Sequence, residues 1–471
     1  MAYSTIDKST DNFNTVLYTG NGSLPRAITG VGYQPDFVWL KDRDTAYNHQ
    51  LYDSVRGTSG GVLYSNTTAA ADSTYQLSSF DSDGYTLGSN LGAVNENTKK
   101  IVGWNWKAGG TAPAITYVVK VVSDSGNKYR FDDFGTSAVT LDLQEGGTYT
   151  FDQADSSNSG HPLRFYTASD KSGGEYTTGV TTTGTPGSSG AKTVITVAAS
   201  APTLYYQCSS HAGMGGQANT NSTFGSSNFD GNKQSLVSAN STSGFSIIKY
   251  SGSGSSSTIG HGLSSAPGMI LVKRTSGTDS WTVYHKEIGA GKYLRLDGTA
   301  AEASNSNTWA NTTPTSTTFS VNHDDTNANG VTFIAYCFAG KTGYSKFGSY
   351  TGNGNANGTF VYTGFKPAFL MVKRSDGGTE NWGMSDDKRY QGGTTNNAPP
   401  SANTIAHKLA ANSSSAESSF GGAGDNLQDY LSNGFKFRDS NGYANASGAT
   451  YIYMAFGQSI VGSNNVPATA R

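Results

Sequence analysis

The chain has 471 residues, of which 14% are charged and 60 are glycine, and its formal net charge is −2. This length predicts several domains, because single hydrophobic cores stop growing at about 250–300 residues. Low charge with abundant glycine and polar residues excludes a coiled coil and favours strands joined by turns. We expect neither nucleic-acid binding, which usually needs a basic stripe, nor membrane insertion, because no run reaches about 18 apolar residues.

The first residues of the chain, 1–13, are polar and lack the apolar centre of a signal peptide. We therefore expect synthesis in a cytoplasm without a signal peptide. The two cysteines, Cys208 and Cys337, lie in different sequence contexts, so no disulfide framework is predicted. Cys337 lies within an apolar segment and is expected to be a buried structural thiol.

Three segments of the chain begin alike, and their spacing predicts three copies of one module. Each starts with Tyr-x-Gly-x-Gly, a proline follows 17 residues after the tyrosine, and a lysine follows six residues after the proline. Each copy closes on an apolar segment that ends in an aromatic residue: residues 101–106, 333–338 and 451–456. The repeated residues are Tyr18, Tyr250 and Tyr350, then Pro35, Pro267 and Pro367, and finally Lys41, Lys273 and Lys373.

The apolar run between each proline and lysine indicates a strand buried on both faces, because it is short and has glycine and proline around it. Many short strands with glycine-rich and polar turns are typical of sandwiches and barrels. We predict an all-β protein of tandem, jelly-roll-like sandwich modules with one different domain inserted. The predicted domains are residues 1–112 (repeat 1), 113–230 (insert), 231–342 (repeat 2) and 343–471 (repeat 3).

The insert ends in a strand that runs into a loop carrying Cys208, His211 and Met214, and His161 lies upstream in a Gly-His-Pro segment. Two imidazoles, one thiolate and a weak thioether are the donors of trigonal copper sites. His161, Cys208, His211 and Met214 are therefore a candidate copper site. Zinc can use the imidazoles and the thiolate, but thioether is not among its usual ligands.

This segment resembles the cupredoxins, small β-sandwich domains that bind blue copper. The resemblance rests on the Cys-x2-His-x2-Met loop, on His161 at an upstream strand edge, and on the Glu145-Gly-Gly147 turn between two strands. It implies a Greek-key sandwich and a copper ion held by these four residues. The residues leave two alternatives open, a metal that only stabilises the domain and a fold whose ligand residues pack without metal.

Aromatic and histidine residues outside the insert divide into three groups. We expect Trp39, Trp104 and Trp106 to lie in the core, because they fall in apolar segments. Better candidates for a carbohydrate platform, with loop packing as the alternative, are Trp281, Trp309 and Trp382. Surface or turn positions are expected for His49, His285 and His323.

The module pattern also resembles a family of marine bacteriophage virion proteins. The residues that carry this resemblance are 18–23, 28–41, 53–57 and 103–109. It is strong in the first repeat and partial in the others. The second repeat departs where it has Tyr284-His-Lys-Glu-Ile288 in place of Asp53-Ser-Val-Arg-Gly57. The resemblance implies a structural or tail-fibre-like role.

We therefore expect a non-enzymatic virion structural protein, a tail fibre, spike or other appendage that contacts a host surface glycan or receptor. No nucleophile elbow, phosphate-binding loop or zinc-protease motif occurs to suggest an enzyme. Expected partners are other virion proteins and copies of the same chain, with a trimer by analogy with fibres. Two alternatives remain, a capsid decoration protein without a receptor role and a copper-binding redox module on a β-scaffold.

Overall fold

The computed structural model of the chain describes residues 4–88, 92–220, 224–389, 404–405, 407–419 and 428–458. Strands dominate these residues, and their one α-helix, α1, covers Asp324–Asn327. The predicted all-β class is thus confirmed. In the same ranges, no helix has the length and apolarity to cross a bilayer.

The first repeat forms two β-sheets that pack against each other. The larger has the strand order β1-β7-β3-β4 and the smaller β2-β6-β5. The strands of the larger sheet are β1 (Phe13–Thr19), β7 (Lys100–Trp106), β3 (Phe37–Asp42) and β4 (Gln50–Asp53). Those of the smaller are β2 (Arg26–Thr29), β6 (Gly84–Leu87) and β5 (Leu77–Asp81).

The second and third repeats contain the same four-strand order, as β19-β26-β21-β22 and β27-β36-β29-β30. In the second repeat these strands are β19 (Phe245–Ser251), β26 (Thr332–Phe338), β21 (Met269–Arg274) and β22 (Thr282–His285), extended by β17 (Ser226–Asn228), β18 (Ser235–Asn240), β23 (Lys292–Arg295) and β24 (Ala303–Ser304). In the third they are β27 (Ser345–Thr351), β36 (Thr450–Gln458), β29 (Lys366–Arg374) and β30 (Gly383–Asp386), extended by β32 (His407–Ala410) and β33 (Ser418–Ser419). The smaller sheets are β20 (Ser257–Gly260) with β25 (Thr318–Val321), and β28 (Phe360–Tyr362), β35 (Gly434–Phe437), β34 (Gln428–Leu431) and β31 (Thr404–Ile405).

The apolar run after each repeated proline forms a strand that is buried on both faces. In β3, Val38 and Leu40 belong to the core of the first repeat, whereas Phe37 and Trp39 belong to a second core. Successive side chains of a strand point to opposite faces, so each run serves two cores at once. Strands β21 and β29 divide their side chains in the same way.

The second core is shared by all three repeats. Phe37 stacks on Tyr336 with ring centroids 4.3 Å apart, and Trp106 lies 5.7 Å from Phe369 and 6.2 Å from Phe338. These pairs join the first repeat to the second and third. The three repeats therefore form one body, held together by burial of large aromatic side chains.

Backbone hydrogen bonds close the three repeats into a ring. In each bond, a backbone amide of one repeat donates to a backbone carbonyl of another repeat. That carbonyl always belongs to the residue two positions after the repeated lysine. The bonds are Ala71 N to Thr275 O (3.0 Å), Glu302 N to Ser375 O (2.9 Å) and Glu417 N to Arg43 O (2.7 Å). They run from the first repeat to the second, from the second to the third, and from the third to the first. One chain thus builds a pseudo-threefold body.

The repeated tyrosine also has a repeated structural role. Tyr18, Tyr250 and Tyr350 each donate a hydroxyl hydrogen bond to a backbone carbonyl, at 2.8, 2.6 and 2.8 Å. In each repeat the residue after that carbonyl is a buried asparagine, Asn95, Asn327 or Asn445. This contact fixes the opening turn of each repeat against the loop before its closing strand.

The structure corrects two predictions for aromatic and histidine residues. Trp281, Trp309 and Trp382 are buried and form no surface platform, whereas burial of Trp39, Trp104, Trp106 and Cys337 is confirmed. The Nε1 atoms of Trp281 and Trp382 donate across repeat boundaries to Tyr64 O and Arg295 O. His49 and His285 are also buried, so their predicted surface positions are wrong, while His323 caps α1 and is partly exposed.

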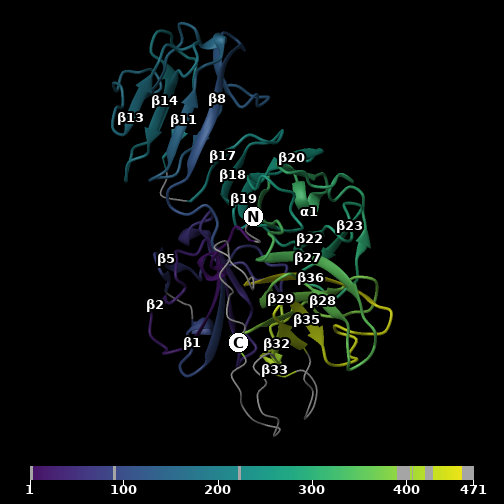
Figure 1. Cartoon of the computed structure of the whole chain (residues 1–471). Helices are drawn as coiled ribbons and strands as arrows, with labels where there is room; N and C mark the ends of the chain where they lie inside the picture. Colours follow the sequence, from purple (N-terminus) through teal and green to yellow (C-terminus); the bar gives the residue numbers. More distant parts are fainter. Residues whose placement is uncertain are drawn as a thin grey trace.

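The insert forms a lobe beside this body, as Figure 1 shows for β8, β11, β13 and β14. Its strands are β8 (Ala114–Ser123), β9 (Asn127–Phe131), β10 (Leu141–Asp142), β11 (Thr148–Asp152), β12 (Leu163–Tyr166), β13 (Val180–Thr183), β14 (Lys192–Thr196), β15 (Leu204–Cys208) and β16 (Gln217–Asn219). They form two sheets, β13-β14-β11-β8-β9 and β10-β16-β15-β12, around a separate core. The cupredoxin-like character of this lobe remains a prediction.

Candidate metal centre

Strand pairing brings the predicted ligands His161 and Cys208 together across 47 residues of sequence. Cys208 is the last residue of β15, and its antiparallel partner on β12 is Leu163. His161 therefore lies just before the paired segment, beside the loop that follows Cys208. A hydrogen bond from Ser209 N to Pro162 O (3.0 Å) continues this pairing beyond the strands.

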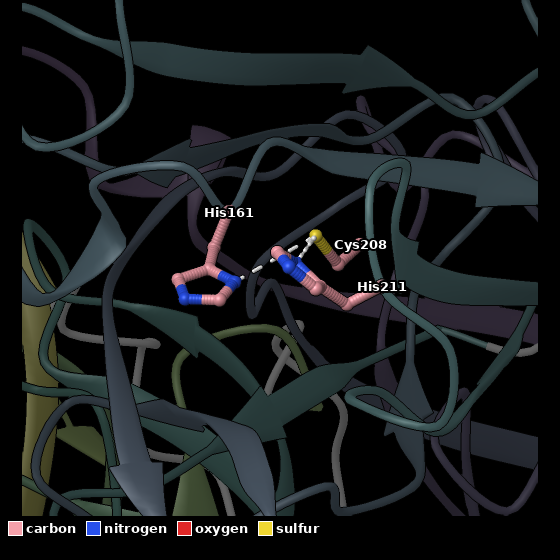
Figure 2. A group of neighbouring side chains, drawn as sticks. All are labelled: His161, Cys208 and His211. Atoms are coloured by element: carbon pink, nitrogen blue, oxygen red, sulfur yellow. Dashed lines mark hydrogen bonds between the residues drawn. The ribbon is translucent and has the colours of Figure 1, made fainter.

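The Nδ1 atoms of two imidazoles, those of His161 and His211, face the Cys208 sulfur (Figure 2). Cys208 Sγ is 3.4 Å from His211 Nδ1 and 3.9 Å from His161 Nδ1, and the ligand atoms of the three residues lie within 4.8 Å of one another. Sulfur and nitrogen ligands at ~2.3 and ~2.0 Å from one ion are separated by roughly 3.6 Å at a near-tetrahedral angle. The spacing therefore fits one ion bound by all three side chains.

The fourth predicted ligand, Met214, lies in the loop between β15 and β16. Its side chain is 1% exposed and belongs to the core of the insert. Its carbonyl accepts a hydrogen bond from Tyr129 N at 2.8 Å. The structure thus buries the Met214 side chain in the same core cluster as Cys208.

Glycine is required in this loop. A Cβ atom added at Gly215 would lie 1.6 Å from Tyr206 O, and one at Gly216 would lie 2.6 Å from Ala138 O. Gly213 has a φ of +69°, which favours glycine. The loop therefore follows the end of β15 so closely that only glycine fits beside the backbone.

Polar residues that sequence reasoning missed hold the ligand segments in place. His161 O accepts from Tyr129 Oη and from Gln153 Nε2, both at 2.9 Å. Lys171 Nζ donates to the carbonyls of Cys208 and His211 at 3.2 and 3.4 Å. These residues lie on distant segments, and nothing near them in sequence marks them as neighbours of the ligands.

Burial of the side chain and the nearby His211 both lower the pKa of His161. A neutral imidazole keeps a free nitrogen lone pair, which a metal ligand needs. Cys208 is buried, His161 is half-buried and His211 is exposed. The arrangement can therefore bind a soft metal ion at the edge of the lobe, with one imidazole in contact with solvent.

Comparison with known proteins gives a family but no described function. No curated protein and no solved structure matches the chain. One family model, described as a domain of unknown function, matches residues 8–139 and 217–459. The candidate ligands lie in the segment between these ranges, whereas all three repeats lie largely within them. Because the match covers most of its length, the chain belongs to the family described as a domain of unknown function, DUF7483.

Proposed function

We propose that this chain is a non-enzymatic structural protein of a bacteriophage particle, an appendage that contacts the host surface. The observation that supports this role best is the closed ring of three repeats around one aromatic core. Such a body is a rigid scaffold, and binding groups on its loops are held in fixed positions. The resemblance of the first repeat to marine phage virion proteins points in the same direction.

Adsorption competition tests host contact directly. Purified chain, added to host cells before the phage that encodes it, is expected to reduce phage adsorption in proportion to its concentration. Heat-denatured chain, which has the same composition but no folded surface, serves as the matched control. Undiminished adsorption at a saturating concentration would contradict the host-contact role and favour a capsid decoration protein.

A second candidate function is copper binding by the insert, and the group formed by His161, Cys208 and His211 favours it. When bound, copper would supply one-electron redox chemistry. The chain itself would supply two neutral imidazoles and a thiolate, and the thiol would release its proton on binding. The exposed edge of His211 would give an electron partner access to the site.

Titration with Cu(II) tests this second function. Wild-type chain is expected to develop an intense thiolate-to-copper absorption band at one equivalent, and Cys208→Ser is expected to lose it. The matched control is Cys337→Ala, because Cys337 is the other buried cysteine and lies in the body. A band that persists in Cys208→Ser, or no band in the wild type, would contradict the proposal. Tight binding of zinc without a copper band would identify a structural zinc site.

A further inference from the structure

A basic cavity lies where the second repeat joins the third. A cavity of about 460 Å³ is lined there by Lys341 from the segment that connects β26 to β27, by Lys346 from β27, by Lys286 from the loop after β22, and by Tyr362 from β28. Pockets for small ligands span about 300–1,000 Å³, so this cavity has room for one or two sugar rings.

The cavity carries an excess of positive charge. Three lysines line it, and none of its described lining residues is acidic. Lys341 donates only a long hydrogen bond, 3.4 Å to Ser265 Oγ, and Lys346 donates to Tyr362 O at 2.7 Å. Within the described ranges neither forms a salt bridge, and Lys286 has only Glu287 at 3.6 Å. The ammonium groups of Lys341 and Lys346, which form no salt bridge within the described ranges, are therefore suited to an anionic ligand.

The connecting segment is held in a fixed turn. Lys341 and Ser345 exchange two backbone hydrogen bonds, of 3.1 and 2.9 Å, and Gly343 between them has a φ of +76°. The Lys341 side chain passes so close to Gly244 that a Cβ there would lie 3.0 Å from Lys341 Cε. The position of the Lys341 ammonium group is therefore restricted before any ligand binds, which reduces the entropy lost on binding.

An exposed aromatic ring borders the same cavity. Tyr362 is 52% exposed, and Phe360, two positions earlier on the same face of β28, is 45% exposed. The Lys346 ammonium group lies 5.2 Å from the centroid of the Tyr362 ring. A large aromatic ring left in solvent, with a cation beside it, presents an apolar face and a charge to one ligand.

We infer that this cavity binds an acidic saccharide, whose ring packs on Tyr362 and whose carboxylate or sulfate group contacts the lysines. The ligand needs both a sugar ring and an acidic group. A simple anion would not pack on the aromatic ring of the cavity, and a neutral sugar would not pair with its ammonium groups. A nucleic acid would need a longer basic surface, and the net charge of the chain is −2. This inference deepens the proposed host contact and rests on it for its biological setting.

Calorimetric titration of the full chain tests the inference with three disaccharides that differ only in being sulfated, carboxylated or neutral. Binding of the sulfated or the carboxylated sugar is expected, with an affinity that falls as salt concentration rises. Which of the two binds more tightly identifies the acidic group. Binding of the neutral sugar with equal affinity, or binding of inorganic sulfate as tightly as the acidic sugar, would overturn the inference.

Three variants locate the site. Lys341→Gln and Tyr362→Ala are each expected to weaken binding by about tenfold or more, because each removes one of the two recognition groups. Lys192→Gln is the matched control, since Lys192 is an exposed lysine on β14 of the insert. Equal affinity in Lys341→Gln and wild type would place the ligand elsewhere. The titration uses only purified components, so its failure leaves the adsorption result of the proposed function unaffected.

Discussion

The Tyr336 hydroxyl of the second repeat donates a 2.7 Å hydrogen bond to Asp53 Oδ2 of the first repeat. The same carboxylate oxygen accepts from Arg56 Nε at 2.5 Å, and all three side chains are buried. Burial, followed by the charge of Asp53, raises the pKa of Tyr336, so the hydroxyl stays protonated as a donor. The contact is one of the polar links between repeats inside an otherwise apolar interface.

A related contact joins the first repeat to the third. Trp104 stands at the position of Tyr336, and its Nε1 atom donates to Asp386 Oδ2 at 3.0 Å. Asp386 pairs with Arg389 as Asp53 pairs with Arg56. At the third boundary His285 replaces the aspartate, and its Nε2 lies 3.2 Å from Tyr453 O. Burial lowers the pKa of His285 to about 4, so where the first repeat has the aspartate of its Asp-Ser-Val-Arg segment, the second repeat has a neutral ring that faces a backbone carbonyl.

Removing the Tyr336 hydroxyl is expected to weaken the body. Tyr336→Phe keeps the ring and deletes the donor to Asp53, so we predict a loss of about 1–3 kcal/mol in the free energy of unfolding. Equilibrium urea unfolding followed by tryptophan fluorescence measures it. Tyr205→Phe is the matched control, since that ring is partly exposed on β15 of the insert, and it is expected to change the stability of the body by less than about 0.5 kcal/mol. Equal stability of both variants would contradict the role of the contact.

The shared core predicts that the three repeats unfold together. Trp106, Phe338 and Phe369 come from different repeats and lie within one aromatic cluster. Unfolding of one repeat alone would therefore expose to water the apolar side chains with which the other two repeats contact it. Differential scanning calorimetry is expected to show one transition for the body, shifted by Tyr336→Phe, with the insert free to unfold separately around its own core. Separate transitions for individual repeats would contradict this account.

The repeated lysines predict a rise in stability at alkaline pH. Burial lowers the pKa of Lys41, Lys273 and Lys373 to about 8 in the folded chain, whereas an unfolded lysine titrates near 10.4. Above pH 8 the unfolded chain therefore binds more protons than the folded chain, and the free energy of unfolding increases with pH. Below pH 8 both states are protonated, and this contribution is constant.

Urea unfolding at several pH values between 7 and 9.5 measures this dependence, in a range below the ordinary titration of tyrosine. Lys273→Met retains the buried aliphatic stem and removes one titrating group, so the rise of stability with pH is expected to be smaller in this variant. Lys192→Met, at an exposed position of β14, is the control and should keep the wild-type dependence. A wild-type stability that falls over this range would contradict the prediction.

The loop after β15 lies so close to Tyr206 that adding one methyl group at Gly215 is expected to abolish copper binding. Gly215→Ala would place a Cβ 1.6 Å from Tyr206 O, so the loop carrying His211 must move away from β15. We expect loss of the thiolate-to-copper band and a lower melting temperature of the insert. Gly135→Ala is the matched control, because a Cβ there meets nothing within 4 Å. A normal band in Gly215→Ala would show that the loop geometry is not needed.

Much of the body could be predicted from the repeated residues, because strand length, turns and alternation are local properties. The tyrosines, prolines and lysines identified three copies, and the apolar runs identified their buried strands. The roles of Trp281, Trp382 and His49 could not be predicted. Each stands just before the fourth strand of its repeat among polar neighbours, and the side chains are buried because another repeat covers them. A local sequence pattern cannot predict burial of a side chain by a residue from a distant part of the chain.

The candidate metal centre was predictable where its residues share one loop. Cys208 and His211 are three residues apart, so their proximity follows from sequence. His161 required strand pairing between β12 and β15, which a Gly-His-Pro segment at a strand edge only suggested. Gln153 and Lys171, which bind the backbone of the ligand segments, gave no sequence signal because amide and ammonium groups are common on surfaces.

Immunogold labelling of intact particles, with antibody raised against the folded chain, tests the central claim most directly. The account predicts label on the tail or its fibres, and preadsorption of the antibody with purified chain should remove that label. Label spread over the capsid would contradict an appendage and favour decoration. Absence of label from every particle, with strong labelling of purified chain as the positive control, would contradict a virion role altogether.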